Sequence, residues 1–155
     1  HVELWPRAGW QTWVPVSLMA LASVIVALAL GHPNPLSFGG AGNARFDPGD
    51  PGIVGWTRHP LLVAIALWAG AHIVPNGDLA HVLLFGAFFA FALFGMRMID
   101  RRKRRQMGPD WARLAQTTRR ISITPGGLLR IALGFALYGL LLWLHAPVIG
   151  AYPLP

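Results

Sequence analysis

Histidine side chains lie at both rims of an apolar run, residues 55–78, and an arginine lies beside the first of them. The run reads GWTRHPLLVAIALWAGAHIVPNGD, with Arg58 and His59 near its start and His72 near its end. Neutral imidazole is a common ligand of transition metals and haem iron, and guanidinium pairs with carboxylate and phosphate groups. Because polar groups beside apolar helices cost free energy unless they are paired or used, both rims are candidate sites.

The two rims must form separate sites. If residues 60–74 are helical, a rise of 1.5 Å per residue separates His59 from His72 by about 20 Å along the axis. The two imidazoles therefore cannot bind the same metal ion, and each belongs to its own layer of polar residues.

The layer around His72 includes a second histidine. His72 and His81 flank the PNGD sequence at residues 75–78, which predicts a tight turn and an antiparallel helical hairpin. The hairpin would bring both imidazoles to similar depth, where they could ligate haem iron or another transition metal, and Asp78 and His145 could join them. Alternatively, each histidine hydrogen-bonds a loop carbonyl or lies in the wet interface.

The layer around Arg58 and His59 favours an anion. Pro60 suits the first turn of a helix, and the free backbone N–H groups there, together with the guanidinium, attract carboxylate or phosphate. We expect Asp100 to pair with Arg58 or with the basic run at residues 101–105. Arg58, His59 and Asp100 are therefore the cofactor-binding candidates, for example for a haem propionate. The alternative is an interfacial anchor and a helix cap.

Composition indicates the elements that must position these residues. Of the 155 residues, 54% are hydrophobic and only 12% are charged, whereas soluble domains carry about a quarter charged residues. The absence of cysteine excludes disulfides, zinc–thiolate sites and iron–sulfur clusters. We predict an all-α, polytopic membrane protein, a single domain over residues 1–155. Its about four transmembrane helices are predicted at 13–31, 60–74, 79–96 and 128–150.

Basic residues predict the orientation. All but one of the 13 lysines and arginines fall on one side of this topology, and Arg7 is the exception. The positive-inside rule therefore places the 97–130 connection in the cytoplasm. Residues 99–120 are predicted to form a basic helix on lipid head groups, with Trp111 and Leu114 facing the bilayer. The positive charge is confined to the membrane rim, and no stacking motif accompanies it. Both observations argue against nucleic-acid binding.

Four short motifs resemble the NnrU family of bacterial membrane proteins. They are R-H-P at 58–60, W-A-x-A-H at 68–72, N-G-D at 76–78 and D-R-R at 100–102. The resemblance covers about residues 10–125. It implies a place in the bacterial inner membrane and a link to nitrate, nitrite and nitric oxide metabolism. Family members usually begin with a further hydrophobic region, so the chain is expected to lack an N-terminal helical region.

The NnrU family is in turn similar to 15-cis-zeta-carotene isomerase, a haem b membrane enzyme with the R-H-P and A-H elements. This resemblance implies haem b as cofactor, with His59 as the leading iron ligand and His72 as the second candidate. It also implies isomerase-like or redox activity, and an isoprenoid or carotenoid substrate. Depth separates the two histidines, so each would need a partner elsewhere.

Two alternatives come from other classes. The R-H-P element is also similar to isoprenylcysteine and phospholipid methyltransferases, in which it helps to hold S-adenosylmethionine. The adjacent carboxylates of that family are reduced here to Asp100 followed by Arg101, which removes part of that site. The other alternative is a non-catalytic factor that assembles or regulates a membrane complex. The Gly and Ala faces of residues 60–74 and 79–96 would then mainly be helix-packing surfaces, and the partners would be other subunits of a membrane complex.

Overall fold

The computed structural model describes residues 2–116 and 125–154, and these residues fold into helices without a β-strand. The five α-helices are α1 (Trp13–Ala29), α2 (Pro60–Ile73), α3 (Leu79–Met107), α4 (Pro109–Ala115) and α5 (Pro125–Ile149). Three short 3-10 helices are η1 (Gly9–Thr12), η2 (Asn43–Arg45) and η3 (Gly52–Gly55).

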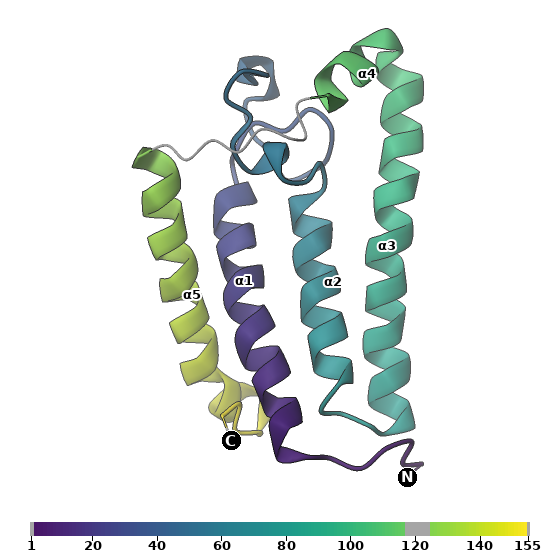
Figure 1. Ribbon diagram of the computed structural model, residues 1–155, viewed down its shortest axis with the longest axis vertical. Helices are drawn as coiled ribbons and strands as arrows, with labels where there is room; N and C mark the ends of the chain where they lie inside the picture. Colours follow the sequence, from purple (N-terminus) through teal and green to yellow (C-terminus); the bar gives the residue numbers. More distant parts are fainter. Residues whose placement is uncertain (1, 117–124, 155) are drawn as a thin grey trace.

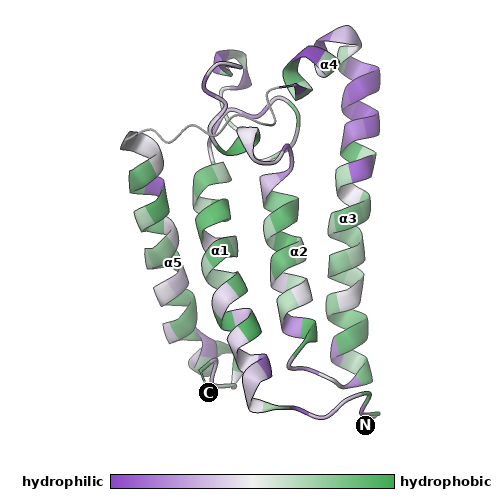
Figure 2. Cartoon of the chain, viewed as in Figure 1, coloured by the Kyte–Doolittle hydropathy of each residue, from purple (hydrophilic) through white to green (hydrophobic). Residues whose placement is uncertain are grey.

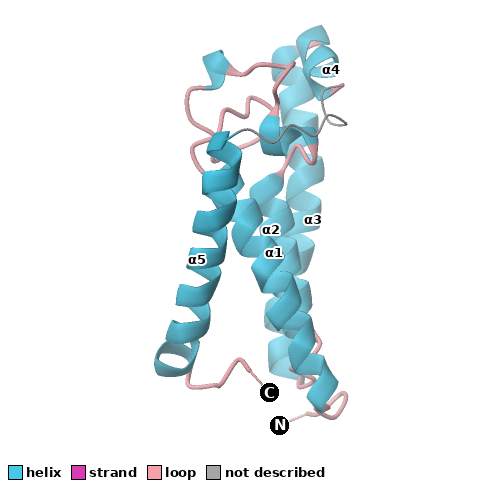
Figure 3. Ribbon diagram, turned by 60° about the vertical axis from the view of Figure 1, so that its left-hand side comes forward, coloured by secondary structure: helices cyan, strands magenta, loops and turns pink. Residues whose placement is uncertain are grey.

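The four long helices lie side by side in the order α5, α1, α2, α3 (Figure 1). Helix α1 packs against both α2 and α5, and α2 also packs against α3. The α1–α2 connection and α4 lie at one end, where the hydrophilic part of α3 also gathers (Figure 2). We call this the basic end. The opposite end, which carries both chain termini and the α2–α3 turn, is the terminal end (Figure 3).

Three helical segments are long and apolar enough to cross a membrane: Gly9–Ala29, Leu79–Met107 and Gly126–Ile149. Only 6% of the apolar windows of α3 and α5 is buried within the chain, so these helices turn their side chains outward, as lipid-exposed helices do. Helix α2 has 14 residues, about 21 Å, and lies between α1 and α3. The predicted polytopic helical membrane protein is confirmed, with three full-length helices and a shorter fourth.

Local signals set the starts of α2 and α3. Pro60 occupies the first turn of α2, where its missing N–H is not needed. Asp78 is the N-cap of α3, and its carboxylate accepts a hydrogen bond from the backbone N–H of His81 at 3.2 Å. The intervening turn makes the two helices an antiparallel hairpin.

The prediction for the basic segment is wrong about where α3 ends, and it is wrong that the segment forms one helix of its own. Helix α3 does not end near residue 96 but continues through the arginine run to Met107, because arginine and lysine are good helix formers. Gly108, at φ +56, then turns the chain into the short helix α4. Part of the predicted helix, residues 117–120, lies outside the described residues.

Helix α4 packs on the protein rather than on lipid. Trp111 and Leu114 contact a buried apolar cluster made by α1 and the α1–α2 connection. The members of this cluster are Ala29, Leu36, Ile53 and Val54. The connection supplies a small core of its own, because Leu36 and Val54 are both 0% exposed.

Helix α5 is fastened to α1 at two heights. The Arg130 guanidinium donates to the Leu30 carbonyl at 2.6 Å, and the Tyr138 hydroxyl donates to the Val16 carbonyl at 2.8 Å. Between them, the buried Gly134 lets the two backbones approach closely. This close contact holds α5 against α1, and both helices also line the cavity at the terminal end.

Replacing Gly134 with alanine should lower the free energy of unfolding by about 1–3 kcal/mol. The added Cβ would lie 2.6 Å from the Cα of Val24, a backbone atom that cannot move aside alone, so α5 must shift. Gly139→Ala is the matched control, because a Cβ there meets nothing within 4 Å. Thermal unfolding in detergent measures both variants, and equal stability of the two would contradict the prediction.

Candidate functional site

At the basic end, a carboxylate joins the two polar residues that precede α2. Arg58 donates to Asp100 through Nη2 to Oδ2 at 2.9 Å and through Nε to Oδ1 at 3.3 Å. His59 Nε2 lies 3.0 Å from Oδ1 of the same carboxylate. The predicted pairing of Arg58 with Asp100 is therefore confirmed, whereas a role of these three residues in binding a cofactor stays a prediction.

The second ring nitrogen of His59 is also occupied. The Ser37 hydroxyl lies 3.0 Å from Nδ1, and His59 is only 3% exposed. A carboxylate can only accept, so Nε2 carries the proton and Nδ1 accepts from Ser37. Iron could bind His59 only if one of these hydrogen bonds were given up. Ser37 could not be found from the sequence, because it lies in the long connection and belongs to no motif.

Two asparagines tie the connection to the same place. Asn34 donates through Nδ2 to the Arg58 carbonyl at 3.0 Å, and its Oδ1 accepts from the Leu36 N–H at 3.1 Å. The Asn34 N–H in turn donates to the Asn43 side chain at 2.8 Å. These bonds hold the connection against the start of α2.

Helix α4 closes the group with an aromatic ring. The Arg104 guanidinium lies 4.1 Å from the centroid of the Trp111 ring, and that of Arg58 lies 5.6 Å from it. Both distances suit cation–π attraction. We call Ser37, Arg58, His59 and Asp100 the polar clasp, because their hydrogen bonds join the connection, α2 and α3. Neither the cavity beside His72 nor the one beside His32 is lined by a clasp residue.

The clasp makes stability depend on pH. Burial lowers the pKa of His59 below its ordinary 6.5, against the opposing attraction of Asp100, while the Arg58 charge lowers it further. Folded His59 is therefore neutral in a range where the unfolded side chain takes up a proton. The unfolded state binds more protons there, so the free energy of unfolding should fall as pH drops below 6.5.

We expect His59→Gln to reduce this loss of stability, because glutamine does not titrate. The measurement is the unfolding temperature in detergent at pH values of about 7.5 and 5.5, on either side of the ordinary histidine pKa. His81→Gln is the control, since that side chain is half exposed and should keep the wild-type dependence. An unchanged pH dependence in His59→Gln would refute the explanation.

At the terminal end, His72 holds its ring in one tautomer. Its Nδ1 lies 2.7 Å from the Trp68 carbonyl, one turn earlier on α2. A carbonyl can only accept, so Nδ1 carries the proton and Nε2 keeps a free lone pair. Nε2 has no hydrogen-bond partner among residues 2–116 and 125–154.

His81 lies near His72 but does not line the same cavity. Its Nδ1 pairs with the Asp78 carboxylate, and the His81 side chain is 50% exposed. The Phe85 ring contacts both imidazoles, with centroid distances of 5.2 Å to His72 and 6.2 Å to His81. A role of His81 as a metal ligand stays a prediction.

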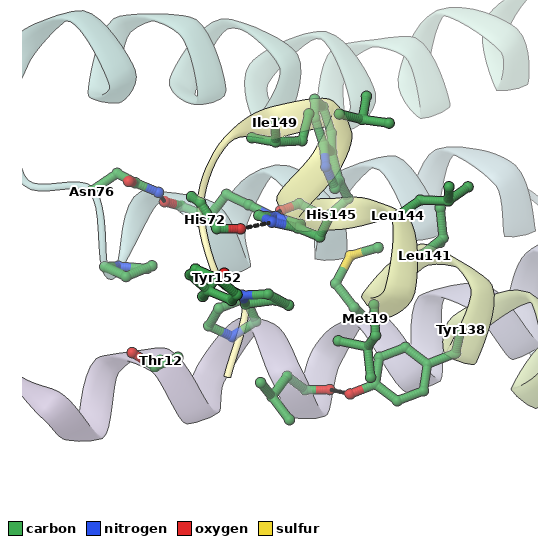
Figure 4. Close-up of a pocket in the computed structure, with 18 of the residues that line it drawn as sticks. Thr12, Met19, His72, Asn76, Tyr138, Leu141, Leu144, His145, Ile149 and Tyr152 are labelled. Atoms are coloured by element: carbon green, nitrogen blue, oxygen red, sulfur yellow. Dashed lines mark hydrogen bonds between the residues drawn. The ribbon is translucent and has the colours of Figure 1, made fainter. Parts of the chain in front are cut away.

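His145 on α5 instead shares a cavity with His72 (Figure 4). Its Nδ1 lies 2.7 Å from the Ala151 carbonyl, which again leaves Nε2 as the free nitrogen. From the sequence, His145 is only a further candidate for the His72 layer.

The cavity lies between α1, α2 and α5, and the C-terminal segment lines it at the terminal end. Its volume is about 420 Å³, within the usual range for small-molecule sites. Most of the lining is apolar, as at Met19 and Leu141, and Arg7 is the charged side chain among the described residues that line it.

The side chains in this cavity that could bind a metal suit haem better than a bare metal ion. The described residues contain no group of three or more histidine, cysteine, aspartate or glutamate side chains that could hold a metal ion. Two imidazoles with free Nε2 atoms in an apolar cavity suit a group that brings its own ligands. A porphyrin supplies four nitrogens and needs only axial ligands from the protein, so these residues fit haem.

Three bilayer-length apolar helices, a polar clasp at one end and a histidine-lined cavity at the other define a polytopic helical membrane protein. The chain belongs to the NnrU family, because the family described as NnrU protein matches residues 1–153. This confirms the resemblance found in the motifs and extends it beyond their range. No curated protein and no solved structure matches the chain.

Proposed function

We propose that this NnrU protein binds haem b in the cavity at the terminal end, where His72 would hold the iron and His145 would be the second imidazole beside it. One observation carries the proposal. Both Nδ1–H groups donate to backbone carbonyls, and both residues line the same apolar cavity. Proteins orient metal-binding histidines by this kind of second hydrogen bond.

The other residues hold His72 in place. The Trp68 carbonyl sets the tautomer of His72, and the Trp68 ring packs against Phe85 and Phe88 of α3 at centroid distances of 5.4 and 5.3 Å. The polar clasp fixes the other end of α2 against α3. In this proposal His59 is a positioning residue rather than an iron ligand.

Haem bound there would supply an iron centre that accepts and donates single electrons within the membrane. Such a centre suits a redox role in nitrate, nitrite or nitric oxide metabolism, the setting implied by the family resemblance. We place the protein in the bacterial inner membrane with the basic end in the cytoplasm, as the arginine distribution favours. An isoprenoid or carotenoid substrate, as in the isomerase, would also suit apolar surroundings.

The test is the absorption spectrum of the full-length protein, purified in detergent after expression with a haem precursor. We expect a Soret band and about one haem per chain by pyridine haemochrome assay. A colourless protein that also fails to take up added haemin would overturn the proposal. In that case, binding of S-adenosylmethionine would favour a methyltransferase, and its absence would favour a non-catalytic assembly or regulatory factor.

A further inference from the structure

We infer that Arg7 binds the acidic group of the molecule held in the cavity at the terminal end. The cavity would thereby take an amphiphile whose acid lies at that end and whose apolar body lies deeper. The inference rests on the proposed function, because haem b is an apolar ring with two propionate groups on one edge.

The lining of the cavity is polarised along its length. Thr12 and Asn76 lie at one end, whereas Met19 and Leu141 lie at the other, with the two histidines between them (Figure 4). Along α1, the step from Thr12 to Met19 corresponds to about 10 Å. An elongated amphiphile therefore fits in one direction, with its polar group beside Thr12 and Asn76.

Arg7 supplies the charge at this polar end. Among the described residues that line the cavity, Arg7 is the charged one. These lining residues include no aspartate or glutamate that could pair with Arg7 in place of a bound acid. The described residues give its guanidinium neither a hydrogen bond nor an ion pair, and the side chain is exposed. A carboxylate could therefore form a charge-assisted, two-point contact without displacing a protein partner.

The segment that carries Arg7 is fixed to the rest of the protein on both sides. The Leu4 N–H donates to the Gly77 carbonyl at 2.7 Å, and Trp5 Nε1 donates to the Val74 carbonyl at 3.0 Å. On the other side, the Ala8 N–H donates to the Gln11 side chain at 2.7 Å. The backbone that carries Arg7 is therefore fixed beside the cavity, at the opposite end of the protein from the arginines of the basic end.

The test compares haem with haem dimethyl ester, in which both acids are blocked. Binding to detergent-purified wild type, Arg7→Gln and Arg7→Lys is titrated through the Soret band. One charge-assisted contact corresponds to about a tenfold change in affinity or more. Wild type should bind haem at least about tenfold more tightly than the ester. Arg7→Gln should lose that preference while keeping the Soret position, and Arg7→Lys should keep part of it.

Arg45→Gln is the matched control, because Arg45 is exposed at the basic end, away from the cavity. It should bind both ligands as wild type does. Equal binding of haem and ester by wild type, or an unchanged preference in Arg7→Gln, would overturn the inference alone. A wild type that binds neither ligand would overturn the proposed function and this inference with it.

Discussion

Replacing His72 with alanine should remove most of the haem from the purified protein, with affinity lowered by about 100-fold or more. Changes to groups that merely orient a metal ligand already cost about 10–100-fold, and this change deletes the ligand itself. His72 is placed for that role, since its Nδ1–H is held by Trp68 and its ring lines the cavity. The measurement is the haem content per chain and the Soret absorbance.

His81→Ala is the control for this experiment. His81 lies on the same hairpin, but it pairs with Asp78, is half exposed and does not line the cavity. The variant should keep its haem, and the unfolding temperature of both variants reports whether the fold survives. Haem loss in His81→Ala together with retention in His72→Ala would reverse the assignment made here.

Replacing Asp100 with asparagine should lower the free energy of unfolding by about 2 kcal/mol. The change removes the charge that Arg58 and His59 share, and it leaves the buried imidazole without a carboxylate acceptor. Breaking a fully buried ion pair costs about 3–5 kcal/mol, and an exposed pair contributes about 0–1 kcal/mol. The Asp100 and Arg58 side chains are 18% and 31% exposed, so the effect should lie between these limits.

Asp110→Asn is the matched control, because Asp110 pairs with Arg113 at the surface, where the side chains are 69% and 74% exposed. Its effect should stay within about 0.5 kcal/mol. Denaturant unfolding in mixed micelles measures both changes. If Asp100→Asn costs no more than Asp110→Asn, the clasp does not stabilise the fold.

The Asp100 variant also tests which end of the protein binds haem. The clasp lies about 20 Å from His72 along α2, so folded Asp100→Asn protein should keep the haem spectrum of the wild type. Loss of haem from a protein that is still folded would instead place the cofactor beside Arg58 and His59. That result would restore the assignment that the resemblance to the isomerase implied.

Local chemistry in the sequence predicts much of the fold. Apolar runs locate α1, α2 and α5, Pro60 begins α2, and the Asp78 cap begins α3. These features depend on interactions within one helical turn, which neighbouring residues decide. The end of α3 was missed because hydropathy marks where an apolar stretch ends, whereas helix propensity carries the backbone on to Gly108.

The sequence by itself determined that this chain is a helical membrane protein with chemistry-bearing residues at two separate depths, because composition, helical rise and charge are properties of the chain. Only the tertiary structure decided which residues share a site. In the structure, the two ring nitrogens of His59 are hydrogen-bonded to Ser37 and Asp100. His145, rather than His81, lines the cavity together with His72. The physical reason is that these contacts depend on which helices become neighbours, and the packing of α5 on α1 leaves no periodic signal along the chain.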